Sequence, residues 1–177
     1  MPVDRYGTNW PLADLKAYAA EVELSNGIPS GGLVALIQQE SAWNPQAVSP
    51  AGAIGLAQFM PPTAAEWEVD PWDPIDSISG AGRYLAWLRS RTPSWTAALA
   101  AYNYGIGNVS RNIAANDGLN VSKLPKETRN YVKKLAPAFG EDPTSSAAPG
   151  GTPEDSGGLN PLLLAAGIAL VWAGVQS

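Results

Sequence analysis

The segment 40–62 holds the side chains whose types and spacing are best suited to chemistry. Glu40 opens the sequence ESAWNP and is followed by a stretch rich in glycine, proline and small residues. The chain contains no cysteine and no histidine, which excludes disulfides, thiolate metal sites and catalysis by a Ser/His pair. Any reaction must therefore rest on carboxylates, hydroxyls, amides or backbone groups.

Glu40 is the candidate general acid. We expect it near the C-terminal end of a helix, where the helix dipole disfavours a charged carboxylate and raises its pKa. Apolar neighbours would act in the same direction, and the candidates are Ile37, Trp43, Leu56 and Met60. The next acidic residue is Glu66, so the loop offers no second carboxylate. The alternative interpretation is a solvated carboxylate at a helix end.

Four stretches resemble, in order, the catalytic domain of the soluble lytic transglycosylases, a relative of goose-type lysozyme. They are ESAWNP with SPAGAIGLAQFMP (40–61), GAGRYL (80–85), AYNYGIGNV (101–109) and ETRNYV (127–132). One such element would be weak evidence, but four in the family's order over about residues 30 to 135 form a specific signal. Two positions depart from the family pattern, because Ala57 replaces a common Met and Tyr104 a common Ala. Both substitutions could alter the cleft wall.

The resemblance implies a mainly α domain of the α+β lysozyme-like superfold, with a cleft and without metal or cofactor. It implies that Glu40 protonates the bridging oxygen between MurNAc and GlcNAc in a peptidoglycan glycan strand. The carboxylate would then take the proton of the muramic acid 6-hydroxyl, which leaves 1,6-anhydroMurNAc. Most glycosidases need two carboxylates, so the isolation of Glu40 suits this reaction.

The resemblance also implies residues on the substrate side. Ser49 and Gln58 would hydrogen-bond the glutamate or the N-acetyl and hydroxyl groups of the sugar, and Met60 would line the cleft. Tyr102 would position the reacting sugar or stabilise its positive charge, while Asn103 would brace the loop or touch the glycan. Each has a structural alternative: a turn at Ser49, core filling by Met60 and simple packing by Tyr102.

Helices are expected to position these residues. Residues 44–62 contain too much glycine and proline for a helix and are expected to be irregular. Asp73 and Asp76 are interpreted as capping residues. Apolar periodicity and boundary residues predict helices over about 11–25, from an N-cap at Ser30 to Glu40, from Asp73-Pro74 through Leu88, from Thr92-Pro93 to Ala101, over 105–115 and over 125–136.

The composition changes after Phe139. The chain is therefore divided into a catalytic domain (1–139), a flexible, disordered linker (140–158) and an apolar run, Leu159–Val175. As a helix this run would span ~26 Å, slightly less than the ~30 Å of a bilayer core. We expect a transmembrane anchor that attaches the chain to a membrane. The alternative is a buried C-terminal helix.

The charge distribution and the N-terminal residues indicate what the protein binds and where it acts. Of the net charge of −5, residues 1–139 carry only −1, so nucleic-acid binding is not expected. The first residues lack a basic segment followed by an apolar run, so no secretory signal is expected. This pattern suggests a virion protein in the internal membrane of a bacteriophage, with other virion proteins as partners. It would open the cell wall locally from the host periplasm during entry.

Two other functions remain open from the sequence. A lysozyme-type hydrolase would use the same fold but add water to the sugar. A wall-binding or structural virion protein would keep the fold without turnover. The intact Glu-Ser motif favours catalysis.

Overall fold

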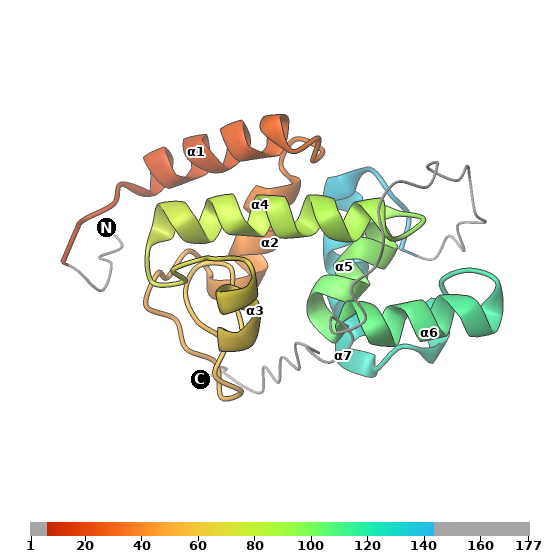
Figure 1. Ribbon diagram of the computed structural model, residues 1–177. Helices are drawn as coiled ribbons and strands as arrows, with labels where there is room; N and C mark the ends of the chain where they lie inside the picture. Colours follow the sequence, from red (N-terminus) through yellow and green to blue (C-terminus); the bar gives the residue numbers. More distant parts are fainter. Residues whose placement is uncertain (1–6, 144–177) are drawn as a thin grey trace, which may run out of the picture. The chain divides into compact units, whose positions relative to one another are not determined.

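The computed structural model describes residues 7–143, and its regular structure within that range is almost entirely helical (Figure 1). The prediction of a mainly α fold is thereby confirmed. Two isolated antiparallel bridges, Val48 with Ile54 and Ile54 with Phe59, join parts of one loop. The helices follow one another as α1 (Leu12–Ser25), α2 (Gly32–Ser41), α3 (Pro61–Glu66), α4 (Pro74–Ser90), α5 (Trp95–Tyr104), α6 (Ile106–Asn116), η1 (Val121–Lys123), α7 (Lys126–Leu135) and η2 (Ala136–Phe139).

Two predicted parts of the chain extend beyond this range. The linker expected over 140–158 is described only as far as residue 143, and the apolar run Leu159–Val175 lies wholly outside the described residues. Within residues 7–143, no helix is both long and apolar enough to cross a membrane. The membrane anchor therefore stays a prediction from the sequence.

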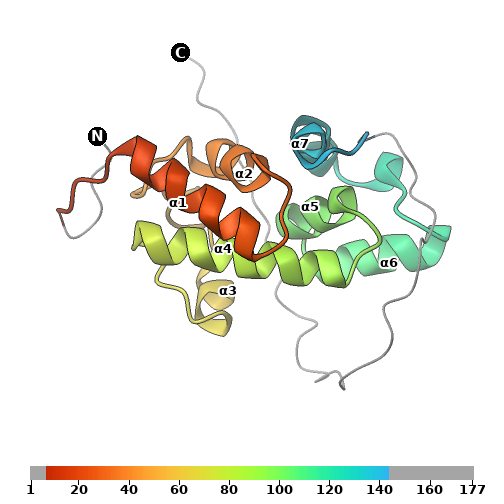
Figure 2. The ribbon, with the colours of Figure 1, turned by 90° about the horizontal axis from the view of Figure 1, so that it is seen from above.

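The described residues form two compact units, the first ending at Tyr84 and the second beginning at Leu85, so that α4 contributes to both. In the first unit, α1 packs against α2 (Figure 2). Helical spacing aligns the apolar side chains of each helix on one side. Those that are buried are Leu15, Ala19 and Val22 of α1 and Leu33, Leu36 and Ile37 of α2. This core holds the helix that carries Glu40.

The start of α2 differs from the sequence prediction in its capping residue. Gly31 is the N-cap, with a left-handed φ of 85° that suits glycine, so the prediction of Ser30 was wrong. The buried carboxylate of Glu23, in α1, accepts hydrogen bonds from the amides of Gly31 (2.8 Å) and Val34 (3.0 Å). Because this carboxylate already satisfies amides of the first turn, no serine cap is needed there.

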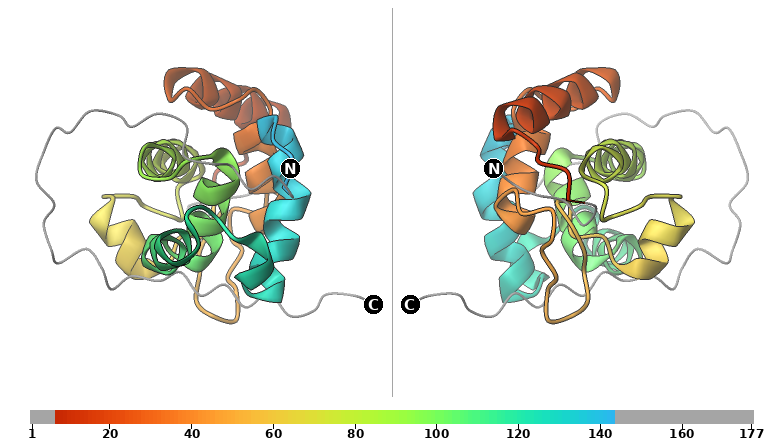
Figure 3. Two further views of the ribbon diagram at one scale, coloured as in Figure 1. Left: turned by 90° about the vertical axis from the view of Figure 1, so that its right-hand side faces the viewer. Right: turned by 90° about the vertical axis from the view of Figure 1, so that its left-hand side faces the viewer.

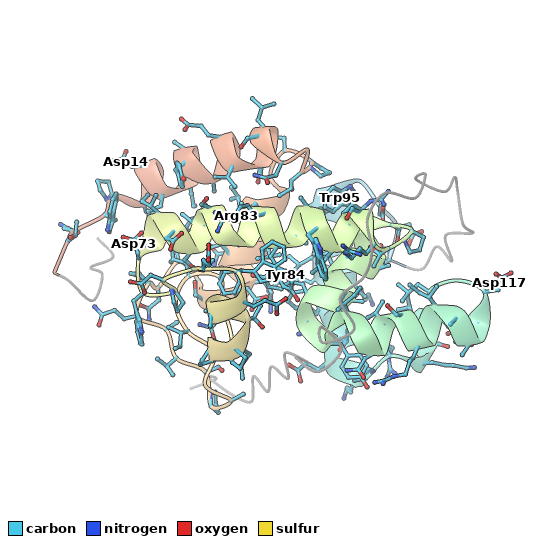
Figure 4. All side chains as sticks on the ribbon, viewed as in Figure 1. Asp14, Asp73, Arg83, Tyr84, Trp95 and Asp117 are labelled. Atoms are coloured by element: carbon cyan, nitrogen blue, oxygen red, sulfur yellow. The ribbon has the colours of Figure 1, made fainter. Side chains whose placement is uncertain are left out.

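The start of α4 follows the sequence prediction. Oδ1 of Asp73 accepts a hydrogen bond from the amide of Asp76 at 2.8 Å, so Asp73, labelled in Figure 4, caps the helix. Further along, a Cβ at Gly80 would lie only 2.3 Å from a methyl carbon of Val69. Glycine at this position therefore lets α4 approach the segment that carries Val69.

In the second unit, α5 lies against both α6 and α7 (Figure 3). Residues 96–103 of α5 are all buried, and four of them are alanines, whose small side chains allow neighbouring helices to come close. The helix runs to Tyr104, three residues beyond the predicted end at Ala101. Its first residue, Trp95, packs against Phe139 of η2 with the rings tilted by 39° and their centroids 5.3 Å apart.

The N-terminal end of α5 also differs from the prediction. The helix is capped by Ser94, whose side chain accepts a hydrogen bond from the amide of Ala97 at 3.1 Å. The predicted start at Thr92 was wrong because the hydroxyl of Thr92 donates instead to the carbonyl of Leu88, in α4, at 2.8 Å. Thr92 therefore closes the preceding helix rather than opening the next.

Glu141 joins the end of the second unit to the start of α5. Its carboxylate accepts hydrogen bonds from the amides of Trp95 (2.8 Å) and Thr96 (2.7 Å) and from the hydroxyl of Thr96 (2.8 Å). A negative charge at a helix N-terminus also interacts favourably with the helix dipole. The folded part of the unit therefore includes Glu141, whereas the composition places the end of the domain at residue 139.

Candidate active site

Glu40 is the penultimate residue of α2, as the sequence predicts, and it is only 3% exposed. The helix ends at Ser41, and the next two residues, Ala42 and Trp43, both have left-handed φ angles of 51° and 65°. Non-glycine residues rarely adopt this conformation, so two in succession indicate a closely constrained turn. The burial of Glu40 rules out the alternative of a solvated helix-end carboxylate.

The loop that follows folds back on itself. The amide of Ile54 donates to the carbonyl of Phe59 at 2.9 Å, and the amide of Phe59 donates to the carbonyl of Ile54 at 3.0 Å. Ser49 is buried, and its Oγ accepts a hydrogen bond from the amide of Ala53 at 3.0 Å. The structural role considered for Ser49, in a turn, is thus confirmed, and its contact with the glycan stays a prediction.

Gly55 fixes the path of this loop. Its φ is 76°, and a Cβ there would lie 1.8 Å from the carbonyl oxygen of Pro71. Its amide donates to the carbonyl of Ala47 at 2.9 Å. Glycine is therefore required both for the backbone angle and for the close approach to the segment before α4.

The buried side chain of Gln58 hydrogen-bonds to the backbone of the same loop through one end of its amide only. The residue is 1% exposed and has a φ of 52°. Its Nε2 donates to the carbonyls of Gly55 (2.9 Å) and Ala47 (3.3 Å), while its Oε1 is buried without a hydrogen-bond partner among residues 7–143. An unpaired buried amide oxygen is uncommon in native proteins and costs about 1–3 kcal/mol. This oxygen is therefore a candidate acceptor for a bound ligand.

Two further buried polar atoms lack a partner within the described residues, and both flank Glu40 in the sequence. They are Oε1 of Gln39 and the indole Nε1 of Trp43. From the sequence, Trp43 is expected only as part of the apolar surroundings of Glu40, and no role is expected for Gln39. Trp43 is 3% exposed, and the Lys16 ammonium lies 5.7 Å from its ring centroid. Unpaired buried atoms depend on tertiary packing, so the sequence carries no signal that could have found them.

Met60 ends the loop and is the N-cap of a helix that the sequence does not predict. Residues up to Met60 are irregular, as expected, but α3 starts at Pro61 with Met60 as its N-cap residue. Proline at the first helical positions has its φ already set for a helix, which explains this start. Met60 is half-buried, and its contact with a substrate stays a prediction.

Tyr84 anchors the loop to α4. Its ring lies 5.2 Å from Trp67 and 6.3 Å from Phe59, measured between centroids, and its side chain extends from α4 toward the α3 segment (Figure 4). Burial raises the pKa of the Tyr84 hydroxyl well above its usual value, and the negative charge of Glu66 adds to that shift. The tyrosine of the GAGRYL element is thus a neutral packing residue.

The second unit carries the other two predicted residues. Tyr102 and Asn103 are adjacent in the last turn of α5 and are 1% and 5% exposed. Gly105 follows with a φ of 89° and allows α6 to begin at once. The predicted site residues thus divide into Glu40, Ser49, Gln58 and Met60 in the first unit and Tyr102 and Asn103 in the second.

The chemistry that the first unit can support rests on the buried carboxylate of Glu40 with amide and indole groups, since the other buried carboxylate, that of Glu23, accepts hydrogen bonds from the first turn of α2. Residues 7–143 bring together no group of three or more Asp, Glu, His or Cys that could hold a metal ion. A buried carboxyl group can donate a proton and, once ionised, accept one. The unpaired amide and indole atoms can bind hydroxyl or acetamido groups, which are the polar groups of an amino sugar.

The chain belongs to the transglycosylase SLT domain family, whose model matches residues 17–124. It is 41% identical over 109 residues to membrane-bound lytic murein transglycosylase F from Shewanella sediminis, covering 55% of this chain and 22% of that protein. It is 32% identical over 142 residues to the protein of the same name from Alcanivorax borkumensis, covering 74% and 30%. The chain thus spans between about a fifth and a third of the length of these relatives.

The solved structures to which this chain is similar include lytic transglycosylases. The 70 kDa soluble lytic transglycosylase from Escherichia coli matches with a TM-score of 0.59 and 30% identity, over 72% of this chain and 23% of that chain. A complex of the 70 kDa soluble enzyme with bulgecin A matches with a TM-score of 0.60 and 28% identity, over 75% and 25%. An inactive glutamate-to-glutamine mutant of Slt from Pseudomonas aeruginosa matches with a TM-score of 0.59 and 25% identity, over 70% and 23%. The resemblance noted in the sequence is thereby confirmed.

Proposed function

We propose that this chain is a peptidoglycan lytic transglycosylase that cleaves the β-1,4 bond between MurNAc and GlcNAc and leaves 1,6-anhydroMurNAc. The observation that carries the proposal is a buried Glu40 followed by a loop whose buried Gln58 keeps an unpaired acceptor. The relatives described above are lytic transglycosylases by name, and one similar structure is an inactive glutamate-to-glutamine mutant. The first fact supports the reaction, and the second supports its dependence on a glutamate.

Glu40 acts twice in the proposed reaction. Its neutral carboxyl group gives a proton to the bridging oxygen while the bond between that oxygen and C1 of MurNAc breaks. The resulting carboxylate takes the proton of the 6-hydroxyl of the same sugar, and the freed oxygen bonds to C1. No water is consumed, and Glu40 returns to its neutral form. Burial favours the neutral form that starts the cycle.

The other site residues bind and orient the sugar. Gln58 accepts a hydrogen bond from a hydroxyl or N-acetyl N–H group through Oε1, and Ser49 binds the glutamate or the substrate. Met60 lines the cleft. Tyr102 positions the reacting sugar or stabilises its positive charge, and Asn103 braces the loop or contacts the glycan. These assignments rest on the family motifs and, for Gln58, on its unpaired oxygen.

Analysis of the products released from purified peptidoglycan tests the proposal. The full chain should release anhydromuropeptides, which are lighter than hydrolysis products by one water molecule. Glu40→Gln should lower this release by about 10²–10⁴-fold, the usual contribution of a general acid and base. Glu66→Gln, which alters the next acidic residue along the chain, is the matched control and should keep its activity.

The two alternatives give other results. A lysozyme-type hydrolase would release hydrated muropeptides, and their release would also depend on Glu40. A wall-binding or structural protein would release neither product, and Glu40→Gln would change nothing. Either result would overturn the proposed reaction.

The proposed location is the cell wall, reached from a membrane. The support is the uncharged apolar run Leu159–Val175, preceded by an acidic, glycine-rich segment. Flotation with lipid vesicles should recover the full chain but not a chain that ends at residue 158. The relatives named above come from bacteria. The virion setting thus stays a prediction, which mass spectrometry of purified phage particles would test.

A further inference from the structure

The charges of the described residues are unevenly divided between the two units. Residues 7–84 contain nine acidic and two basic side chains, a net charge of −7. Residues 85–143 contain four acidic and eight basic side chains, a net charge of +4. A polyanion is therefore repelled by the first unit and attracted by the second. The two charges sum to only −3 over residues 7–143, which hides this division.

The positive charge of the second unit gathers on α7 and on η1, which precedes it. The buried residues of α7, Thr128, Tyr131, Val132 and Leu135, all lie on one side. Helical spacing places Lys126 and Lys133 on the opposite side, about 10 Å apart along the axis, with Lys134 beside them. We call the exposed residues Lys123, Lys126, Lys133 and Lys134 the basic surface.

Arg129 ties the parts of this surface together. Its guanidinium donates to the carbonyls of Leu124 (2.7 Å) and Ser122 (3.3 Å), which fixes η1 against the start of α7. The ammonium of Lys123 lies 2.7 Å from Oδ1 of Asn116 in α6. The surface is thus built on ordered backbone and not on a loose tail.

No carboxylate among the described residues pairs with Lys126, Lys133 or Lys134. Unpaired like charges on one helix repel one another unless an anion is present. A lysine ammonium is a point charge on a flexible stem, which suits several carboxylates in variable positions better than one anion of fixed shape. The basic surface therefore fits a polymer that carries repeated carboxylates.

We infer that the basic surface is an accessory binding surface for the carboxylates of the peptide stems that peptidoglycan strands carry. This inference rests on the proposed function, because it concerns the same substrate. Its structural support is that α7 packs on α5, the helix whose last turn carries Tyr102 and Asn103. The apolar side of α7 is buried in that contact and cannot insert into a lipid bilayer, which disfavours a membrane as the partner.

Binding by the full chain in a Glu40→Gln background tests the inference without turnover. The ligands are peptidoglycan with intact stems, the same glycan after an amidase has removed the stems, and vesicles that contain phosphatidylglycerol. Lys126→Gln with Lys133→Gln is the test variant, and Lys→Arg at both positions preserves the charge. Arg83→Gln with Arg91→Gln removes two exposed positive charges elsewhere and is the matched control for net charge.

The test variant should bind stem-bearing peptidoglycan about tenfold more weakly at low ionic strength, or ~3-fold per lysine. The difference should shrink as salt is added. Binding to stripped glycan should not change, and the Lys→Arg and Arg→Gln variants should match the parent chain.

An equal loss on both glycans, no loss at all, or a loss confined to vesicles would overturn the inference. The failure of the proposed function would be seen separately, because the chain with Glu40 intact would then release no anhydromuropeptides. Stem-dependent binding by the Glu40→Gln chain does not depend on that release.

Discussion

The carboxylate of Glu23 accepts a 2.8 Å hydrogen bond from the amide of Gly31 and so links α1 to the helix that carries Glu40. Glu23→Ala would leave this amide and that of Val34 without an acceptor, so we expect a loss of about 2–4 kcal/mol in the free energy of unfolding. Glu23→Gln should lose less, because one acceptor oxygen remains. Urea denaturation measures both. Glu21→Ala, an exposed change on the same helix, should cost no more than about 0.5 kcal/mol, and an equal effect at both positions would contradict the assignment.

Gly55 and Gly52 form a matched pair for testing how the loop is held. Both have left-handed φ angles, 76° and 87°, but a Cβ would collide with the Pro71 carbonyl only at Gly55. Gly52→Ala should cost about 1–2 kcal/mol from the backbone angle alone. Gly55→Ala should cost clearly more and lower product release, because the loop or the Pro71 segment must move. Thermal unfolding and the release assay would contradict this account if the two variants behaved alike.

The unpaired oxygen of Gln58 should matter more for activity than for the loop. Gln58→Met keeps the size of the side chain but removes Oε1 and the two Nε2 hydrogen bonds. We expect kcat/KM for peptidoglycan to fall about tenfold or more in the folded fraction. Gln38→Met, at an exposed position of α2, is the control and should have no effect. If the Gln58 variant lost stability yet kept full kcat/KM, Gln58 would be a structural residue only.

Glu141 should stabilise the second unit although it lies beyond the predicted end of the domain. Glu141→Ala removes three hydrogen bonds to the first turn of α5, and we expect a loss of about 2–3 kcal/mol in the free energy of unfolding. A fragment ending at residue 143 should likewise be more stable than one ending at 139. Glu127→Gln, at an exposed site on α7, provides the comparison. Equal melting temperatures for the two fragments would show that the contact adds nothing.

Tyr84 should make the protein less stable at high pH. Burial, with a smaller effect of Glu66, raises the pKa of its hydroxyl in the folded state, whereas the unfolded chain ionises at a pKa of about 10. The stabilisation from this group is complete below that pH and is lost as the pH rises toward the higher folded value. The unfolding free energy should therefore fall above about pH 10, by up to about 1.4 kcal/mol per pH unit more than in Tyr84→Phe. Parallel pH profiles of the two proteins would count against the shift.

The sequence by itself determined the helical architecture and the identity of the catalytic candidate. Local signals were sufficient for this, since Asp73-Pro74 starts α4 and the Glu-Ser motif ends α2 as predicted. The start of α5 and the cap of α2 were missed, because Thr92 and Glu23 form contacts that local propensity does not contain. The short helix α3 was missed for a different reason, since the glycine-rich sequence before it masked the helical start at Pro61-Pro62.

Only the tertiary structure decided which polar atoms are left for a ligand. Whether both ends of the Gln58 amide find partners inside the protein depends on which carbonyl and N–H groups the folded loop brings to it, and here only Nε2 has partners among the described residues. The positive side of α7 was likewise hidden in a sequence of net charge −5 until folding buried one side of the helix and exposed its lysines. Hydrogen-bond satisfaction and burial are properties of the packed chain. Motif and spacing could therefore identify Glu40 but not the buried polar groups of the first unit that remain unpaired.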